Sequence, residues 1–115
     1  MAGQVLGGLG EMGRTIAIVE DEALLRENYA DAMRGQGYVV DCYADRPLAL
    51  EAFRARLPDL AIIDIGLGDE IEGGFDLCRE LRSLSDTVPI IFLSIEGRRT
   101  FRRVDRAGLY RLKSP

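Results

Sequence analysis

Three acidic side chains directly follow two apolar segments of the sequence, and they are the residues best suited to chemistry. Glu20 and Asp21 come after the apolar run 15–19, and Asp64 comes after the apolar run 60–63. Three carboxylates in one small cleft repel one another, and a hard divalent cation that accepts oxygen ligands relieves this repulsion. The cluster therefore predicts Mg²⁺. A carboxylate nucleophile beside Mg²⁺ is suited to phosphoryl transfer, which depends on positioning and charge neutralisation.

The same acids also have structural interpretations. Acidic residues before a helix cap its first turn and complement the helix dipole, and this alternative stays open for Glu20 and Asp21. Asp64 is different because it lies between Ile63 and Ile65, where burial of an unpaired carboxylate is costly. We therefore expect a metal ion or another cation beside Asp64.

Two further polar residues end later apolar runs. Ser94 follows the run 89–93, and Lys113 follows the run 109–112. Taken singly, Ser94 is interpretable as a strand-end hydroxyl bonded to the backbone, and Lys113 as a solvated lysine. If both lie at the same edge as the acids, we expect them to contact the oxygens of a phosphoryl group.

The spacing of apolar residues predicts strands that alternate with helices. The predicted strands span 15–19, 38–43, 60–63, 89–93 and 109–113, and the predicted helices span 22–34, 46–55, 75–84 and, on a weak apolar stripe, 97–106. This alternation implies right-handed crossovers and a parallel α/β sheet with helices on both faces. Ligands of such sheets bind beyond the carboxyl ends of the strands, so the five polar residues above would share one edge.

Length and composition describe one ordinary domain. The chain has 115 residues, of which 47% are hydrophobic and 30% charged, with a net charge of -4. No apolar run is long enough to span a membrane and no secretion signal begins the chain, so we expect a cytoplasmic protein. With two cysteines and no histidine, a disulfide scaffold, a zinc site and histidine catalysis are excluded. The glycine-rich residues 1–13 are predicted to be a disordered leader before a domain at 14–115.

Charge is distributed unevenly along the chain. Residues 1–97 hold 8 Arg and 18 acidic residues, while residues 98–115 hold 6 Arg, one Lys and one Asp. A basic segment of this kind can bind nucleic acid. The acidity of the remainder argues against that function, for which the candidate residues are Arg98, Arg99, Arg102, Arg103 and Arg106.

Two segments resemble the receiver domain of response regulators in bacterial two-component systems. Residues 16–22 are similar to the first strand and acidic pair of that family, and residues 58–64 are similar to its phosphoacceptor strand. The resemblance implies a five-stranded flavodoxin-like fold. It also implies a cytoplasmic signalling function in phosphorelay and transcription regulation, with a sensor histidine kinase as partner.

The resemblance implies a role for individual residues as well. Asp64 would accept the phosphoryl group, and Mg²⁺ would be bound by Asp21, Asp64 and the carbonyl of Gly66, with Glu20 acting mostly through water. Ser94 matches the hydroxyl switch position. The switch aromatic of the family precedes its lysine by three residues, as Tyr110 precedes Lys113 here.

The chain departs from the family in two places. Gly68 stands where a proline is usual, and the loop 66–74 is about two residues longer than in the family. The segment 94–115 is divergent and shorter, and the last helix of the family is missing. We therefore expect either a truncated or frame-shifted regulator or a natural short receiver. One sheet face would be covered by the first helix alone, which favours association into a homodimer.

The segment 20–93 is most similar to regulators of proteobacterial sortase-associated systems, which carry a DNA-binding winged helix after the receiver. Nucleic acid would then be contacted only through an output domain absent from this chain. The main alternative function is a phosphorylation-independent or non-functional truncated receiver that acts by protein–protein interaction. A Mg²⁺-dependent phosphohydrolase is the less favoured alternative, since Ile65 and Gly66 stand where a second acid would be useful.

Overall fold

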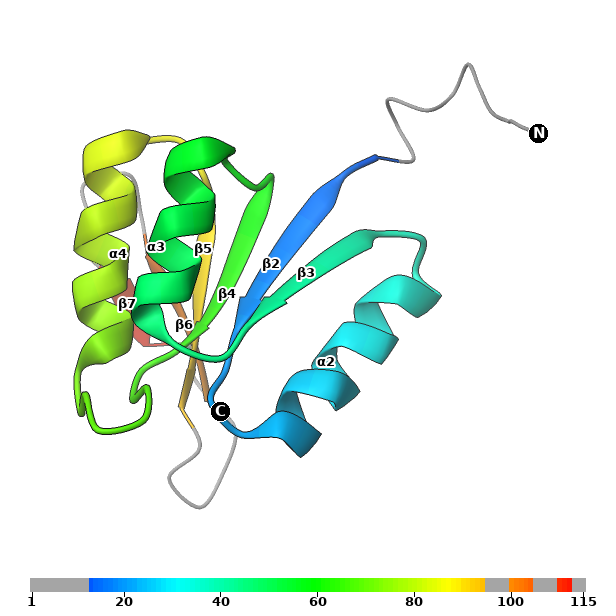
Figure 1. Ribbon diagram of the computed structural model, residues 1–115, viewed down its shortest axis with the longest axis horizontal. Coiled ribbons are helices and arrows are strands. Elements are labelled where there is room, and N and C mark those ends of the chain that lie inside the picture. The colour runs from blue at the N-terminus through cyan, green and yellow to red at the C-terminus, as the bar shows by residue number, and fades with distance from the viewer. Residues whose placement is uncertain (1–12, 95–99, 105–109, 113–115) are drawn as a thin grey trace.

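The computed structural model describes residues 13–94, 100–104 and 110–112, with residue 94 and the last two segments described by their backbone. The elements are β2 (Thr15–Val19), α2 (Ala23–Gly35), β3 (Val39–Tyr43), α3 (Arg46–Ala55), β4 (Leu60–Asp64), α4 (Gly73–Leu84), β5 (Ile90–Ser94), β6 (Thr100–Val104) and β7 (Tyr110–Leu112). The strands form one sheet in the order β3-β2-β4-β5-β6-β7 (Figure 1).

The first four strands are parallel. β2 pairs with β3 on one side and with β4 on the other, and β4 pairs with β5. β2 and β4 are short apolar runs with nearly every residue buried, as expected for central strands that are covered on both faces. Each of the helices α2, α3 and α4 connects two parallel strands, and this crossover brings the carboxyl ends of all four strands to one edge.

Helices cover both faces of the sheet (Figure 1). Successive strand residues point to opposite faces, and β2 accordingly contributes Ile16 and Ile18 to a core that includes Ala30 of α2. Ala17 and Val19 contribute to the larger core on the other face, under α3 and α4. The predicted α/β class, with helices on both faces of a flavodoxin-like sheet, is confirmed.

Local signals explain two of the helix ends. The helix α3 begins where predicted, because the carboxylate of Asp45 accepts a hydrogen bond of 2.9 Å from the backbone N–H of Leu48. Gly37 has a φ of +98° just after α2, a conformation that glycine adopts without steric cost. The helix α4 begins at Gly73, two residues before the predicted start at residue 75.

The predicted helix at 97–106 is wrong in its central part. Residues Thr100–Val104 form β6, which pairs antiparallel with β5, so that Ser94 lies opposite Thr100. Thr, Phe and Val favour strands, and the segment has only two large apolar residues with which a helix could cover a sheet. As a strand, it hydrogen-bonds with the edge of β5 that would otherwise be unpaired.

The last predicted strand is present but lies elsewhere in the sheet. Tyr110–Leu112 form β7, which pairs antiparallel with β6 rather than parallel with β5. The sheet therefore has six strands, not five parallel ones. The predicted disordered leader lies outside the described residues apart from Gly13. None of the helices in the described part of the chain has the length and apolar character needed to cross a membrane.

Candidate functional site

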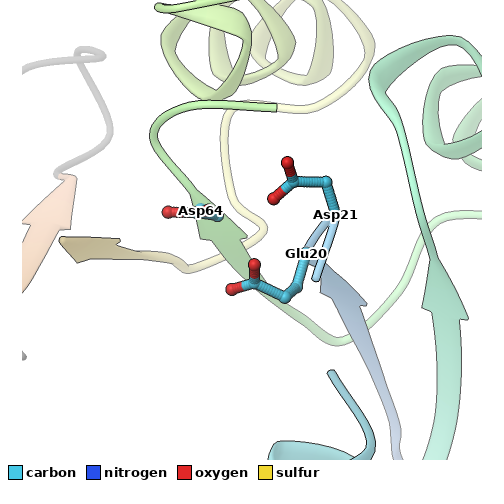
Figure 2. Close-up of side chains that lie close together, drawn as sticks. All are labelled: Glu20, Asp21 and Asp64. Atoms are coloured by element: carbon cyan, nitrogen blue, oxygen red, sulfur yellow. The ribbon is translucent and has the colours of Figure 1, made fainter. Parts of the chain in front are cut away.

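Three carboxylates lie together at the carboxyl ends of β2 and β4. Glu20 and Asp21 follow β2, and Asp64 is the last residue of β4 (Figure 2). One carboxylate oxygen from each of the three residues lies within 4.8 Å of the others. Glu20 and Asp64 are buried, with exposed fractions of 0% and 4%, while Asp21 is exposed. The sequence prediction that these acids converge is confirmed.

The backbone fixes the position of Glu20 from both sides. Its N–H donates to the carbonyl of Tyr43 at 3.0 Å, and its own carbonyl accepts from Nη1 of Arg26 at 2.8 Å. Its Oε2 accepts from the N–H of Glu22 at 3.1 Å. Its Oε1 is buried and has no hydrogen-bond partner among the described residues. A buried oxygen without a partner is costly, and this one belongs to the acidic cluster.

Burial and mutual repulsion disfavour ionisation of the cluster. Burial is the main cause that raises the pKa of Glu20 from 4.5 to about 8, and the nearby charge of Asp64 adds to it against the hydrogen bond from Glu22. Burial likewise raises the pKa of Asp64 from 3.8 to about 6, with the charge of Asp21 as the next cause. Burial and repulsion therefore favour a protonated carboxyl group in the cluster near neutral pH.

The cluster fits a divalent metal ion. All three side chains offer carboxylate oxygens, the donors that hard cations such as Mg²⁺ and Ca²⁺ prefer. A cation bound among the three carboxylates would give the unpartnered Oε1 of Glu20 a partner and would balance the charges that raise the pKa values of Glu20 and Asp64. Soft metals are disfavoured because no histidine is present in the chain and no cysteine belongs to the cluster.

The loop between β4 and α4 contacts the cluster through its backbone. The N–H of Gly68 donates to Oδ2 of Asp21 at 2.9 Å. Gly68 has a φ of +63°, a conformation that side chains other than glycine disfavour. The sequence prediction that glycine lets the backbone approach the site is therefore confirmed at Gly68. Gly66, the predicted carbonyl ligand, lies two residues after Asp64 in the same loop, and its role as a ligand stays a prediction.

Sequence reasoning did not identify Gly74, which packs directly on the end of β4. A Cβ atom at this position would lie 2.1 Å from the carbonyl oxygen of Asp64 and 2.8 Å from Cα of Ile65. The N–H of Gly74 donates to the carbonyl of Ile65 at 2.7 Å. The first turn of α4 is thus held against the strand that carries Asp64. The two adjacent glycines, 73 and 74, are the sequence feature that could have indicated this close packing.

Of the other predicted site residues, Ser94 and Tyr110 are described by their backbone alone. Ser94 ends β5, whose neighbouring residue Leu93 pairs with Asp64. Tyr110 begins β7 opposite Val104, which pairs with Ile90 at the far end of β5. Lys113 lies outside the described residues, as do Arg98, Arg99 and Arg106.

The chain matches the response regulator receiver domain over residues 16–110. It belongs to that family. The acidic pocket of Glu20, Asp21 and Asp64 is typical of the phosphorylation site of receivers. The resemblance to response-regulator receivers that the sequence predicted is therefore confirmed.

Among curated relatives, this receiver is 43% identical over 82 residues to the two-component response regulator PhoP of Pseudomonas aeruginosa, with 71% of this chain and 36% of the relative covered. It is 32% identical over 80 residues to the transcriptional regulatory protein CreB of Escherichia coli, with 70% and 34% covered. The chain thus spans about a third of the length of these relatives.

Solved structures give the same assignment. The response regulator TrrA of Thermotoga maritima, in complex with Mg²⁺ and BeF, has a TM-score of 0.65 and 28% identity over 70% of this chain and 69% of that chain. The non-phosphorylated HemR receiver domain of Leptospira biflexa has a TM-score of 0.64 and 27% identity over 71% of this chain and 64% of that chain.

Proposed function

We propose that Asp64 accepts a phosphoryl group from a sensor histidine kinase and that the acidic cluster binds Mg²⁺ for this transfer. The observation that carries the proposal is the position of Asp64, which is buried at the end of a central strand of a receiver and lies beside two further carboxylates. Burial and the charge of Asp21 raise the pKa of Asp64 to about 6, and perturbed carboxyl groups of this kind are concentrated at functional sites.

The transfer needs little covalent machinery. A carboxylate oxygen of Asp64 forms the bond to phosphorus while the bond between phosphorus and the donor atom breaks, and the leaving group takes the electron pair. For a kinase the donor atom is a histidine nitrogen, and for acetyl phosphate it is the acetate oxygen. Mg²⁺, when bound, supplies positive charge beside the phosphoryl oxygens.

The proposed Mg²⁺ ligands are Asp21, Asp64 and the carbonyl of Gly66, with Glu20 acting mostly through water. The proximity of the three carboxylates supports this set, as does the loop that brings Gly68 to Asp21. The related TrrA structure holds Mg²⁺ and BeF, which supports the choice of magnesium.

Ser94 and Lys113 are proposed to contact the phosphoryl oxygens, and Ser94 and Tyr110 to rearrange when Asp64 is phosphorylated. The end of β5 beside β4 supports the role of Ser94. β7 is parallel to β5 but separated from it by β6, so Tyr110 would have to act from two strands away.

Regulation of transcription by the whole protein is also a proposal, since the curated relatives are about three times as long as the matched segment. Nucleic acid would be contacted through an output domain outside this chain. Cytoplasmic location and homodimer formation stay predictions from the sequence.

The proposal is tested by incubating the purified chain with Mg²⁺ and acetyl phosphate and measuring its intact mass. We expect a phosphoryl-sized gain in the wild type and in Asp69→Asn, which removes an exposed acid of the neighbouring loop, but not in Asp64→Asn. No gain in wild-type protein that circular dichroism shows to be folded would refute the proposal and favour a phosphorylation-independent interaction module. Steady multiple turnover of the donor would favour a phosphohydrolase instead.

A further inference from the structure

Arg46 connects three parts of the chain that are distant in sequence. It is the first residue of α3, and its guanidinium group donates hydrogen bonds to Glu70 in the loop between β4 and α4 and to Glu80 in α4. Nε lies 2.8 Å from Oε1 of Glu70, and Nη1 lies 2.9 Å from Oε2 of Glu80. Arg46 thus binds one carboxylate in the loop and another in the helix that follows it.

Glu70 is connected by the backbone to the residues that face the acidic cluster. Its N–H donates to the carbonyl of Leu67 at 3.0 Å, and its carbonyl accepts from the N–H of Leu67 at 2.9 Å. These two bonds close a tight turn that contains Gly68. Because the N–H of Gly68 donates to Asp21, a displacement of Glu70 would be transmitted to the hydrogen bond that orients this acid.

The turn 67–70 has few other side-chain anchors among the described residues. Leu67 is 2% exposed and packs in the larger core, whereas Ile71 is 83% exposed and does not hold the loop. Gly66 and Gly68 add backbone freedom. Within the turn 67–70, the side-chain anchors among the described contacts are therefore Leu67 at one end and the ion pair of Glu70 with Arg46 at the other.

We propose that Arg46 is a positioning residue for the cation site, holding the β4–α4 loop through Glu70 so that Gly66 and Gly68 face Asp21 and Asp64. This inference rests on the proposed function, since it concerns the same site. The bond between Arg46 and Glu80 has a different role: it ties α3 to α4 and stabilises the fold without orienting the loop.

The sign of the effect of Arg46→Gln separates positioning from simple electrostatics. Loss of a positive charge from the domain favours cation binding, because it removes a repulsion between the arginine and the cation. Loss of a positioning contact weakens it, as for other groups that orient metal ligands. The matched control is Arg79→Gln, which removes the same charge from α4 and breaks an exposed ion pair with Asp76.

The experiment is a titration of each full-length variant with Mn²⁺, in which free Mn²⁺ is measured by electron paramagnetic resonance. We expect Arg46→Gln to weaken Mn²⁺ binding about threefold to fivefold, the range that a partly exposed ion-pair network supports. Arg46→Lys should recover part of the affinity, because lysine keeps the charge but cannot bind two carboxylates in a planar fork. Arg79→Gln should bind at least as tightly as the wild type.

Two glutamate variants test the two ion pairs of Arg46 separately. Glu70→Gln should weaken Mn²⁺ binding as Arg46→Gln does, beyond the change in Asp69→Asn, which removes one charge from the same loop. Glu80→Gln should lower the thermal midpoint of unfolding but leave Mn²⁺ affinity within about twofold of the wild type. Exchange of the Gly68 amide, followed by nuclear magnetic resonance, should accelerate in Arg46→Gln and Glu70→Gln and not in Glu80→Gln.

Unchanged or tighter Mn²⁺ binding in folded Arg46→Gln, with the wild type binding normally, would overturn the positioning role. Equal weakening of Mn²⁺ binding in Glu80→Gln would overturn the positioning role as well, because Arg46 would then act only by connecting α3 to α4. Failure of the proposed function gives a different result, since the wild type itself would then bind no Mn²⁺ or would gain no phosphoryl group from acetyl phosphate.

Discussion

Replacing Glu20 by glutamine should stabilise the domain when no divalent cation is present. The Glu20 carboxylate is fully buried, and burial is the main cause that raises its pKa from 4.5 to about 8. Glutamine keeps an oxygen that can accept from the N–H of Glu22, as Oε2 of Glu20 does at 3.1 Å, and carries no charge. The substitution therefore removes an unfavourable ionisation without removing the hydrogen bond that fixes the residue.

The magnitude follows from the difference in pKa between the folded and unfolded states. A change from 4.5 to about 8 corresponds to ~5 kcal/mol if it is fully expressed. Solvent and side-chain relaxation around the carboxylate reduce this value, so we expect Glu20→Gln to raise the free energy of unfolding at pH 8 by about 2–4 kcal/mol. The corresponding rise in the thermal midpoint is at least about 8 °C.

The effect should depend on pH in a defined direction. Because the folded state holds the Glu20 proton more tightly than the unfolded state, the wild type loses stability as pH rises from about 4.5 to about 8. Asp64 adds a loss between 3.8 and about 6. Below about pH 4.5 glutamate and glutamine are both uncharged, so the two proteins should have similar stability there.

The assay is thermal unfolding by circular dichroism at pH 4.5 and pH 8, with and without Mg²⁺. Saturating Mg²⁺ should stabilise the wild type more than Glu20→Gln and so reduce the difference at pH 8. Glu51→Gln, which removes an exposed glutamate from α3, should have no comparable effect. A Glu20→Gln protein no more stable than the wild type at pH 8 without Mg²⁺ would refute this explanation of the buried acid.

Two further substitutions test how the strand ends are positioned. Gly74→Ala places a Cβ atom 2.1 Å from the carbonyl oxygen of Asp64, so it should lower the free energy of unfolding in urea by about 1–3 kcal/mol or more. The control is Gly35→Ala, because nothing lies within 4 Å of the Cβ atom added there. Equal stability of the two variants would contradict the close packing of Gly74 against Asp64. Asp45→Ala removes the cap of α3 and should destabilise by about 1 kcal/mol, whereas an unchanged urea midpoint would show that this cap contributes nothing.

Much of the fold could be predicted because local signals agreed with it. The strand Thr15–Val19 is an apolar run that ends at two acids, and the helix Arg46–Ala55 follows a capping Asp. The segment 97–106 has a weak apolar stripe of only Phe101 and Val104. Thr100–Val104 form a strand because they pair with β5. This partner lies outside the local apolar pattern, so the pattern could not indicate the pairing.

The acidic site could be predicted from strand ends, but its supporting contacts could not. Asp64 stood out because a carboxylate between two isoleucines needs compensation. The close approach of Gly74 to Asp64 depends on the path of α4 across the end of β4. The pairing of Arg46 with Glu70 spans 24 residues. Long-range contacts of this kind leave no periodic pattern in the sequence.

Chemical mapping of the phosphorylated residue is the most direct measurement. The chain is phosphorylated with acetyl phosphate and Mg²⁺ and then reduced with borohydride, which converts a phosphorylated aspartate into homoserine. Peptide mass spectrometry then locates the converted residue. We expect homoserine at position 64 and nowhere else. Conversion at position 21 instead, or no conversion in folded protein, would contradict the assignment of Asp64 as the phosphoacceptor.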